Sequence, residues 1–237
     1  MIIGNALAGK HWQIQGELHH LVGAVQTSHI PFITMSTGNN GIFSRITGDE
    51  FGLEKDEKTA LKLFKRAAKL SNAAAQYNLG MAYACGYYGL TADKDKAIYW
   101  LKKSVKGENP MACLQMGLYY FYTVQTESAY KKAFDLFTDA YNFGEDQAII
   151  NIGLCYLQGK GVERDPKEAV KCFKEAAKTA NSGVAYYNLG ICYENGFGVR
   201  KDYKKAIEAY KNATENGERQ GLVAIKNVYL KMNEKKE

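Results

Sequence analysis

The sequence predicts an all-α fold, built as a stack of antiparallel helix pairs. Two residue types carry this prediction because each recurs every 36 or 37 residues. One is alanine, at Ala60, Ala97, Ala133, Ala169 and Ala206. The other is tyrosine, at Tyr83, Tyr120, Tyr156, Tyr193 and Tyr229. A single helix pair of this size cannot bury its apolar face, so the copies are expected to stack beside one another.

The first helix of each copy carries a glycine three residues before the recurring tyrosine. These glycines are Gly80, Gly117, Gly153 and Gly190, and Lys226 takes the position in the last copy. A glycine inside a helix costs ~1 kcal/mol relative to alanine. We therefore expect two helices to cross closely at each glycine, and we interpret the tyrosines as packing residues.

The second helix of each copy carries a stripe of alternating small and large residues. A large residue follows the recurring alanine by four positions: Phe64, Leu101, Phe137, Phe173 and Tyr210. An aspartate precedes the alanine by four in most copies, at Asp56, Asp93, Asp165 and Asp202. Aspartate is a favoured helix N-cap, and Pro166 suits the first helical position, so the second helices should begin there.

Residues 1–47 have a different composition, with only three charged residues and all four histidines of the chain. We expect a divergent N-terminal cap or degenerate repeat, with an amphipathic helix over 12–27. The scattered histidines favour no metal site. The remaining boundaries predicted from the repeat are a partial copy at 48–74, full copies at 75–111, 112–147, 148–184 and 185–220, and a C-terminal capping helix at 221–237.

Charge, cysteine content and hydropathy narrow the classes of function. The net charge of +6 is modest and the signs are mixed along the helices, so we expect no nucleic-acid partner. No apolar run is long enough for a membrane span. Five cysteines without metal-ligand spacing indicate apolar fillers in a reducing compartment, and no cofactor. The N-terminus lacks the regions of a signal peptide, so we expect a cytoplasmic protein.

Two segments, AIINIGLCYLQGKGVERDPKEA (148–169) and AYYNLGICYENGFGVRKDYKKA (185–206), resemble the Sel1-like repeat family, a relative of the tetratricopeptide repeats. Residues 75–97 match with one extra loop residue, whereas 112–133 lack the glycine loop. The resemblance implies a right-handed α-solenoid, or superhelix. It also implies an adaptor that binds a protein or peptide partner.

A row of carboxamides lies two residues before the repeated glycine: Asn78, Gln115, Asn151 and Asn188. One turn further on the same face come Ala82, Tyr119, Cys155 and Cys192. First helices of stacked pairs line the concave surface, so these eight residues are the predicted partner-binding site. Glu194 and Asn195 near the loop are further candidates. The alternative is that the amides tie neighbouring repeats together.

The function predicted from the sequence is a non-enzymatic scaffold or adaptor that binds a peptide or protein on the concave face. An alternative is a bacterial immunity or inhibitor protein that covers the active site of a toxin or effector. A third hypothesis, a hydrolase of cell-wall or β-lactam substrates, rests only on the S-x-x-K match from Ser128 to Lys131. The partner motifs of that enzyme class are absent from the sequence, so no catalytic residue is assigned.

Overall fold

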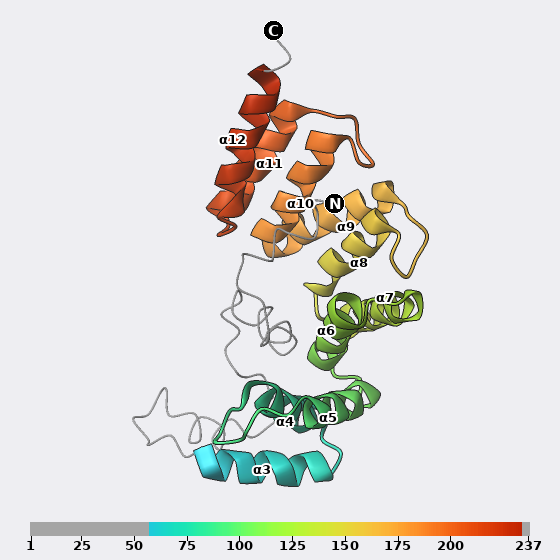
Figure 1. The fold of residues 1–237 in the computed structure, drawn as a ribbon, viewed down its shortest axis with the longest axis vertical. Coiled ribbons are helices and arrows are strands. Elements are labelled where there is room, and N and C mark those ends of the chain that lie inside the picture. Colours follow the sequence, from blue (N-terminus) through green and yellow to red (C-terminus); the bar gives the residue numbers. More distant parts are fainter. Residues whose placement is uncertain (1–56, 234–237) are drawn as a thin grey trace. The chain divides into compact units, whose positions relative to one another are not determined.

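The described part of the chain is entirely helical. The structure is a computed structural model that describes residues 57–233, and within this range it contains ten α-helices, one π-helical segment and no strand (Figure 1). This confirms the all-α prediction. The predictions for residues 1–47 and for Asp56 lie outside the described residues. The chain divides into two compact units at Gln125, and each is described by itself.

The unit that ends at Gln125 contains the helices of the first copies. These are α3 (Glu57–Lys69), α4 (Ala73–Cys85), α5 (Lys94–Lys106), α6 (Pro110–Tyr119) and the π-helix η2 (Tyr120–Val124). Helices that follow one another in the chain also contact one another. Phe64 of α3 and Leu79 of α4 lie in a shared apolar core, against which Trp100 of α5 packs.

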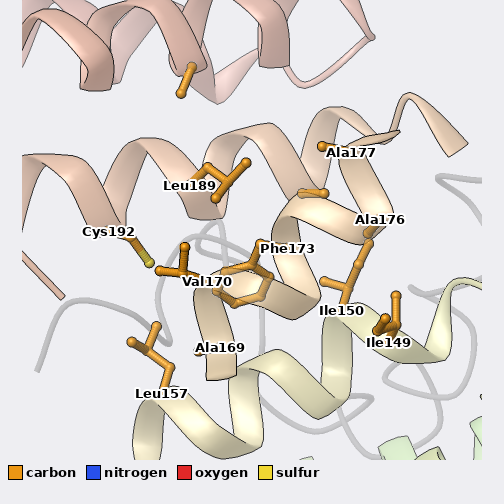
Figure 2. Packing of buried hydrophobic residues seen from close by; sticks show 12 residues of the cluster. Ile149, Ile150, Leu157, Ala169, Val170, Phe173, Ala176, Ala177, Leu189 and Cys192 are labelled. Atoms are coloured by element: carbon orange, nitrogen blue, oxygen red, sulfur yellow. The ribbon is translucent and has the colours of Figure 1, made fainter. Parts of the chain in front are cut away.

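The unit that begins at Thr126 contains six helices within its described residues. They are α7 (Glu127–Asn142), α8 (Ala148–Gln158), α9 (Pro166–Ala180), α10 (Gly183–Asn195), α11 (Tyr203–Glu215) and α12 (Gln220–Asn233). Figure 2 shows the ring of Phe173 from α9 between side chains of α8 and of α10. Within this unit α9 thus packs against the first helix of its own copy, α8, and of the next, α10, and α11 lies between α10 and α12 in the same way.

Three of the repeated glycines, Gly80, Gly153 and Gly190, lie where two helices cross, as predicted. A Cβ atom at Gly80 would lie 2.9 Å from Cγ of Leu101, and one at Gly153 would lie 2.7 Å from Cε1 of Phe173. A side chain at Gly190 would collide even more closely with the ring of Tyr210. In these three copies the large residue of the second helix therefore fills the space that the glycine leaves.

The predicted aspartate caps are confirmed at Asp93, Asp165 and Asp202, whose side chains accept hydrogen bonds from the backbone N–H groups that begin α5, α9 and α11. Pro166 occupies the first turn of α9. The backbone N–H of each capping aspartate also donates to the carbonyl of the repeated tyrosine, at 2.8 Å for Asp202 and Tyr193. This bond joins the two helices of a copy across their loop.

The copy without a glycine loop continues its first helix instead of turning. The chain of α6 passes into η2, and Gln125 ends that π-helix in a left-handed conformation (φ 51°). Thr126, rather than an aspartate or Ser128, then caps α7 by accepting a hydrogen bond from the N–H of Ala129. Without the glycine loop, the first helix of this copy thus ends in a π-helix and a left-handed residue, and both helices of the copy are still formed.

The first four of the repeated tyrosines are half-buried, and three of these four pack on the core. Tyr83, Tyr156 and Tyr193 each lie against a cluster of buried residues. Tyr229 in the last helix is 50% exposed. The packing interpretation therefore holds for the three inner tyrosines, whereas the terminal one has no following helix to cover it within the described chain.

Candidate partner-binding surface

The row of carboxamides on the first helices divides into two surface positions and two buried ones. Asn78 on α4 and Asn151 on α8 are half-buried and therefore partly exposed. Gln115 on α6 and Asn188 on α10 are only 2% and 6% exposed. A partner could reach the amides of Asn78 and Asn151, but not the two buried ones.

Three of the predicted partner-binding residues are core residues. Ala82 is 1% exposed, and Cys155 and Cys192 are completely buried. Their carbonyl oxygens accept the N–H of the glycine that ends each helix, at 2.8 Å for Gly159 and Gly196. The side chains at this position, in the last turn of the helix, are small and buried, so a partner cannot contact them in this structure. Tyr119 is half-buried, and Nζ of Lys94 lies 5.7 Å from its ring centroid.

The buried amides do not form a common network between repeats. Nδ2 of Asn188 donates to the carbonyl of Val184 in its own helix, at 2.9 Å. Oε1 of Gln115 is buried and accepts no hydrogen bond within the described structure. A buried acceptor of this kind usually binds an ordered water.

Other polar side chains, which the sequence analysis did not select, join neighbouring helices. Nε2 of Gln76 donates to the carbonyl of Ala68 at 3.1 Å and so links α4 to α3. Oγ of Ser104 donates to the carbonyl of Ala73 at 2.6 Å and links α5 to α4. Ser104 belongs to the small positions of the second-helix stripe, where a hydroxyl among alanines was the available signal.

Glu194 links three helices through its carboxylate. Its side chain is buried, and Oε2 accepts a hydrogen bond from the hydroxyl of Tyr210 at 2.7 Å. Oε1 pairs with Nζ of Lys231 at 2.6 Å. The carboxylate thereby connects α10, α11 and α12. Asn195 is exposed and bonds the carbonyl of Ile191 in its own helix.

The described residues contain little that would support covalent chemistry. Burial raises the pKa of the Cys155 and Cys192 thiols to about 12 and that of Cys172 to about 11, so these thiols stay protonated near neutral pH. None of the five cysteines, all of which lie among the described residues, forms a disulfide there. The exposed hydroxyl of Ser128 lies 3.3 Å from that of Thr126, within hydrogen-bond distance. In the range 57–233 no three metal-ligating side chains gather, and no helix has the length and hydropathy needed to cross a membrane.

The chain is similar to segments of several curated proteins. It is 31% identical over 119 residues to an ERAD-associated E3 ubiquitin-protein ligase component from Arabidopsis thaliana, covering 49% of this chain and 18% of that protein. It is 29% identical over 127 residues to a chitin synthase regulator from Saccharomyces cerevisiae, covering 52% of this chain and 18% of the regulator. The chain thus spans about a fifth of the length of these two relatives.

Two solved structures share the arrangement of helices. A Sel1 repeat protein from Oxalobacter formigenes has a TM-score of 0.69 and 29% identity, over 79% of this chain and 74% of that one. A protective antigen from uropathogenic Escherichia coli has a TM-score of 0.70 and 28% identity, over 92% of this chain and 44% of the antigen. The family model of the Sel1 repeat matches five times, at residues 46–72, 73–109, 110–142, 146–178 and 183–218. Because these five matches cover more than half of its length, this chain belongs to the Sel1 repeat family.

Proposed function

We propose that this chain is a non-enzymatic protein-interaction module, which binds a peptide or protein partner along the exposed edges of its first helices. The observation that carries the proposal is the repeated amide that stays at the surface, in Asn78 and Asn151. A carboxamide offers both a donor and an acceptor, so it can pair with the backbone of an extended peptide. Tyr119 adds a half-buried aromatic surface one turn after the row.

The character of the relatives supports an adaptor role. One matched relative is named as a component of a ubiquitin ligase and another as a regulator of chitin synthase. Both names describe a protein that works with an enzyme. The protonated thiols and the buried, fully paired Glu194 of this chain also agree with a binding role rather than a catalytic one.

The test compares surface amides with a buried one. Affinity capture from the native cell, followed by mass spectrometry, identifies the proteins that the chain retains. The double variant Asn78→Ala/Asn151→Ala should lose a retained partner while its melting temperature stays within a few degrees of the wild type, since surface substitutions usually change stability by less than about 0.5 kcal/mol.

Asn188→Ala is the matched control. This amide is buried and donates to a carbonyl of its own helix, so its loss should lower the free energy of unfolding by ~1 kcal/mol. The fraction of the protein that remains folded should bind the partner as the wild type does. If the double variant retains every partner of the wild type, the first-helix row is not the binding site.

A further inference from the structure

A groove of about 500 Å³ lies between the second helices α9 and α11, with α10 beneath it. Ala177, Leu189 and Ala209 form its bottom, and each is less than 10% exposed. The half-buried rings of Tyr186 and Tyr193 from α10 also line it. We call this surface the α9–α11 groove. It shares no residue with the first-helix row.

In the preceding copy a tyrosine side chain of the protein itself occupies the equivalent place. The positions equivalent to Ala177 and Ala209 are Tyr141 on α7 and Cys172 on α9. Tyr141 packs against the same core, and its hydroxyl donates to Oε1 of Glu175 at 2.7 Å. That hydrogen bond is the main cause of a raised pKa at Tyr141, so the phenol stays protonated and keeps donating.

The two places also differ in charge. Three lysines line the α9–α11 groove: Lys174, Lys178 and Lys205. The equivalent positions around Tyr141 hold no basic residue; they are Thr138, Asn142 and Glu168. Within residues 57–233 none of these three lysines forms an ion pair with a carboxylate. Nζ of Lys205 instead lies 5.8 Å from the ring centroid of Tyr193. Glu208 is the one acidic side chain among the groove residues.

We infer that the α9–α11 groove binds an acidic polypeptide segment, with an aromatic side chain of that segment inserted where Tyr141 lies in the preceding copy. Ala177 and Ala209 leave the space, Leu189 and the two tyrosines supply an apolar bed, and the lysines complement carboxylates on either side of the aromatic residue. Asn212, at the position of Glu175, offers a side-chain oxygen to a tyrosine hydroxyl. The occupant is therefore an acidic segment with a tyrosine anchor.

The chain offers a variant that closes the groove from within. Ala177→Tyr copies Tyr141, so the new ring should fill the site without disturbing the fold. The probe is a fluorescein-labelled peptide, EEEYEEE, titrated with the full chain and followed by fluorescence anisotropy. Ala177→Tyr should weaken binding about tenfold or more, because aromatic anchors dominate such interfaces. Lys178→Glu/Lys205→Glu should weaken it to a similar extent, whereas Lys211→Glu, an exposed charge reversal outside the groove lining, should not.

Three outcomes would overturn the inference. The first is that the peptide does not bind, or binds the Ala177→Tyr protein as tightly as the wild type. The second is equal binding of the peptide EEEAEEE, and the third is equal binding of an oligothymidylate, since either result would indicate attraction to any polyanion. If Ala177→Tyr fails to fold, the lysine double variant decides the question. The Asn78→Ala/Asn151→Ala protein should bind EEEYEEE normally, so this inference and the proposed function can fail separately.

Discussion

Tyr156 and Tyr229 hold the same position in the repeat, yet their surroundings differ. The ring of Tyr156 meets that of Phe134 edge to face, with centroids 5.5 Å apart, and packs on the core of α8, α9 and α10. Tyr229 is half-exposed on the last helix. The position therefore contributes to stability only where a neighbouring copy covers it.

We predict that Tyr156→Ala lowers the free energy of unfolding by about 2 kcal/mol, which is less than a fully buried aromatic residue would lose. The melting temperature should then fall by several degrees, as measured by circular dichroism. Tyr229→Ala is the control and should hardly change it. Equal melting temperatures for Tyr156→Ala and the wild type would contradict a packing role.

The buried thiols predict how stability depends on pH. Burial raises the pKa of Cys155 and Cys192 to about 12, from a usual value near 9. Below about pH 9 these thiols are neutral in both the folded and the unfolded chain, so their contribution to stability is complete. As the pH rises from about 9 toward 12, the unfolded chain ionises and the folded one does not. The free energy of unfolding should therefore fall in this range, as measured by urea denaturation at a series of pH values.

The control for this prediction replaces both cysteines by alanine, the residue that another copy has at the same position of the repeat. Ala82 occupies it in α4, so Cys155→Ala/Cys192→Ala should fold and should show a smaller fall of stability at alkaline pH. Burial, helped by the hydrogen bond to Glu194, also raises the pKa of Tyr210, which remains in the variant. An unchanged alkaline slope in the variant would assign the effect to other groups.

At the scale of elements, the second glycine of two loops, α8–α9 and α10–α11, joins one copy to the preceding one. Gly161, between α8 and α9, lies against the backbone of Tyr130 at the start of α7. Gly198, between α10 and α11, lies in the same way against the backbone of Pro166 in α9. A Cβ atom at either glycine would overlap the carbonyl oxygen of the earlier helix. This contact, made by backbone, sets how closely consecutive copies approach.

Gly198→Ala should therefore be costly for two reasons, its positive φ of 66° and the overlap with Pro166. Gly89→Ala separates the effect of the positive φ from that of the overlap. Gly89 has a similar φ of 72°, but a Cβ atom added there would have no other atom within 4 Å. We expect Gly89→Ala to cost about 1 kcal/mol from backbone strain alone. Gly198→Ala should cost at least 1 kcal/mol more in urea denaturation. Equal losses would mean that the loop contact does not hold the copies together.

Much of the helix arrangement could be predicted from the sequence, because the repeat allows equivalent positions to be compared between several copies. The crossing at Gly190 and the caps at Asp165 and Asp202 follow from side-chain size and capping chemistry. The π-helix at Tyr120–Val124 could not be predicted, since the sequence showed only that a glycine loop was missing.

The exposure of the candidate binding residues was harder to predict than the fold. Cys155 and Cys192 lie on the same face of a helix as the row of amides, and helical spacing alone does not tell which edge of that face a neighbouring helix covers. The α9–α11 groove had an available signal in the change from Tyr141 to Ala177. This difference is found when the second helices are aligned by the repeat and the side-chain sizes at equivalent positions are then compared.

At the scale of the whole molecule, the positions that hold the Sel1 repeats together differ from the positions proposed to bind a partner. Gly190, Tyr210 and Glu194 belong to the first class, and the amides of Asn78 and Asn151 to the second. The two compact units each contain both classes: Asn78 lies in one, and Asn151 and the α9–α11 groove lie in the other. A partner could therefore be recognised by either unit without any change in how the helices pack.

The most direct test measures binding and stability on the same samples. The partner retained by the wild-type chain is purified and titrated by calorimetry into the wild type, Asn78→Ala/Asn151→Ala and Ala177→Tyr, and the melting temperature of each chain is recorded. We predict saturable binding by the wild type, and an affinity at least about tenfold lower in one of the two variants at an unchanged melting temperature. Wild-type affinity in both variants, or a loss of affinity only in step with a loss of folding, would contradict the claim that this chain recognises a partner through residues its fold does not need.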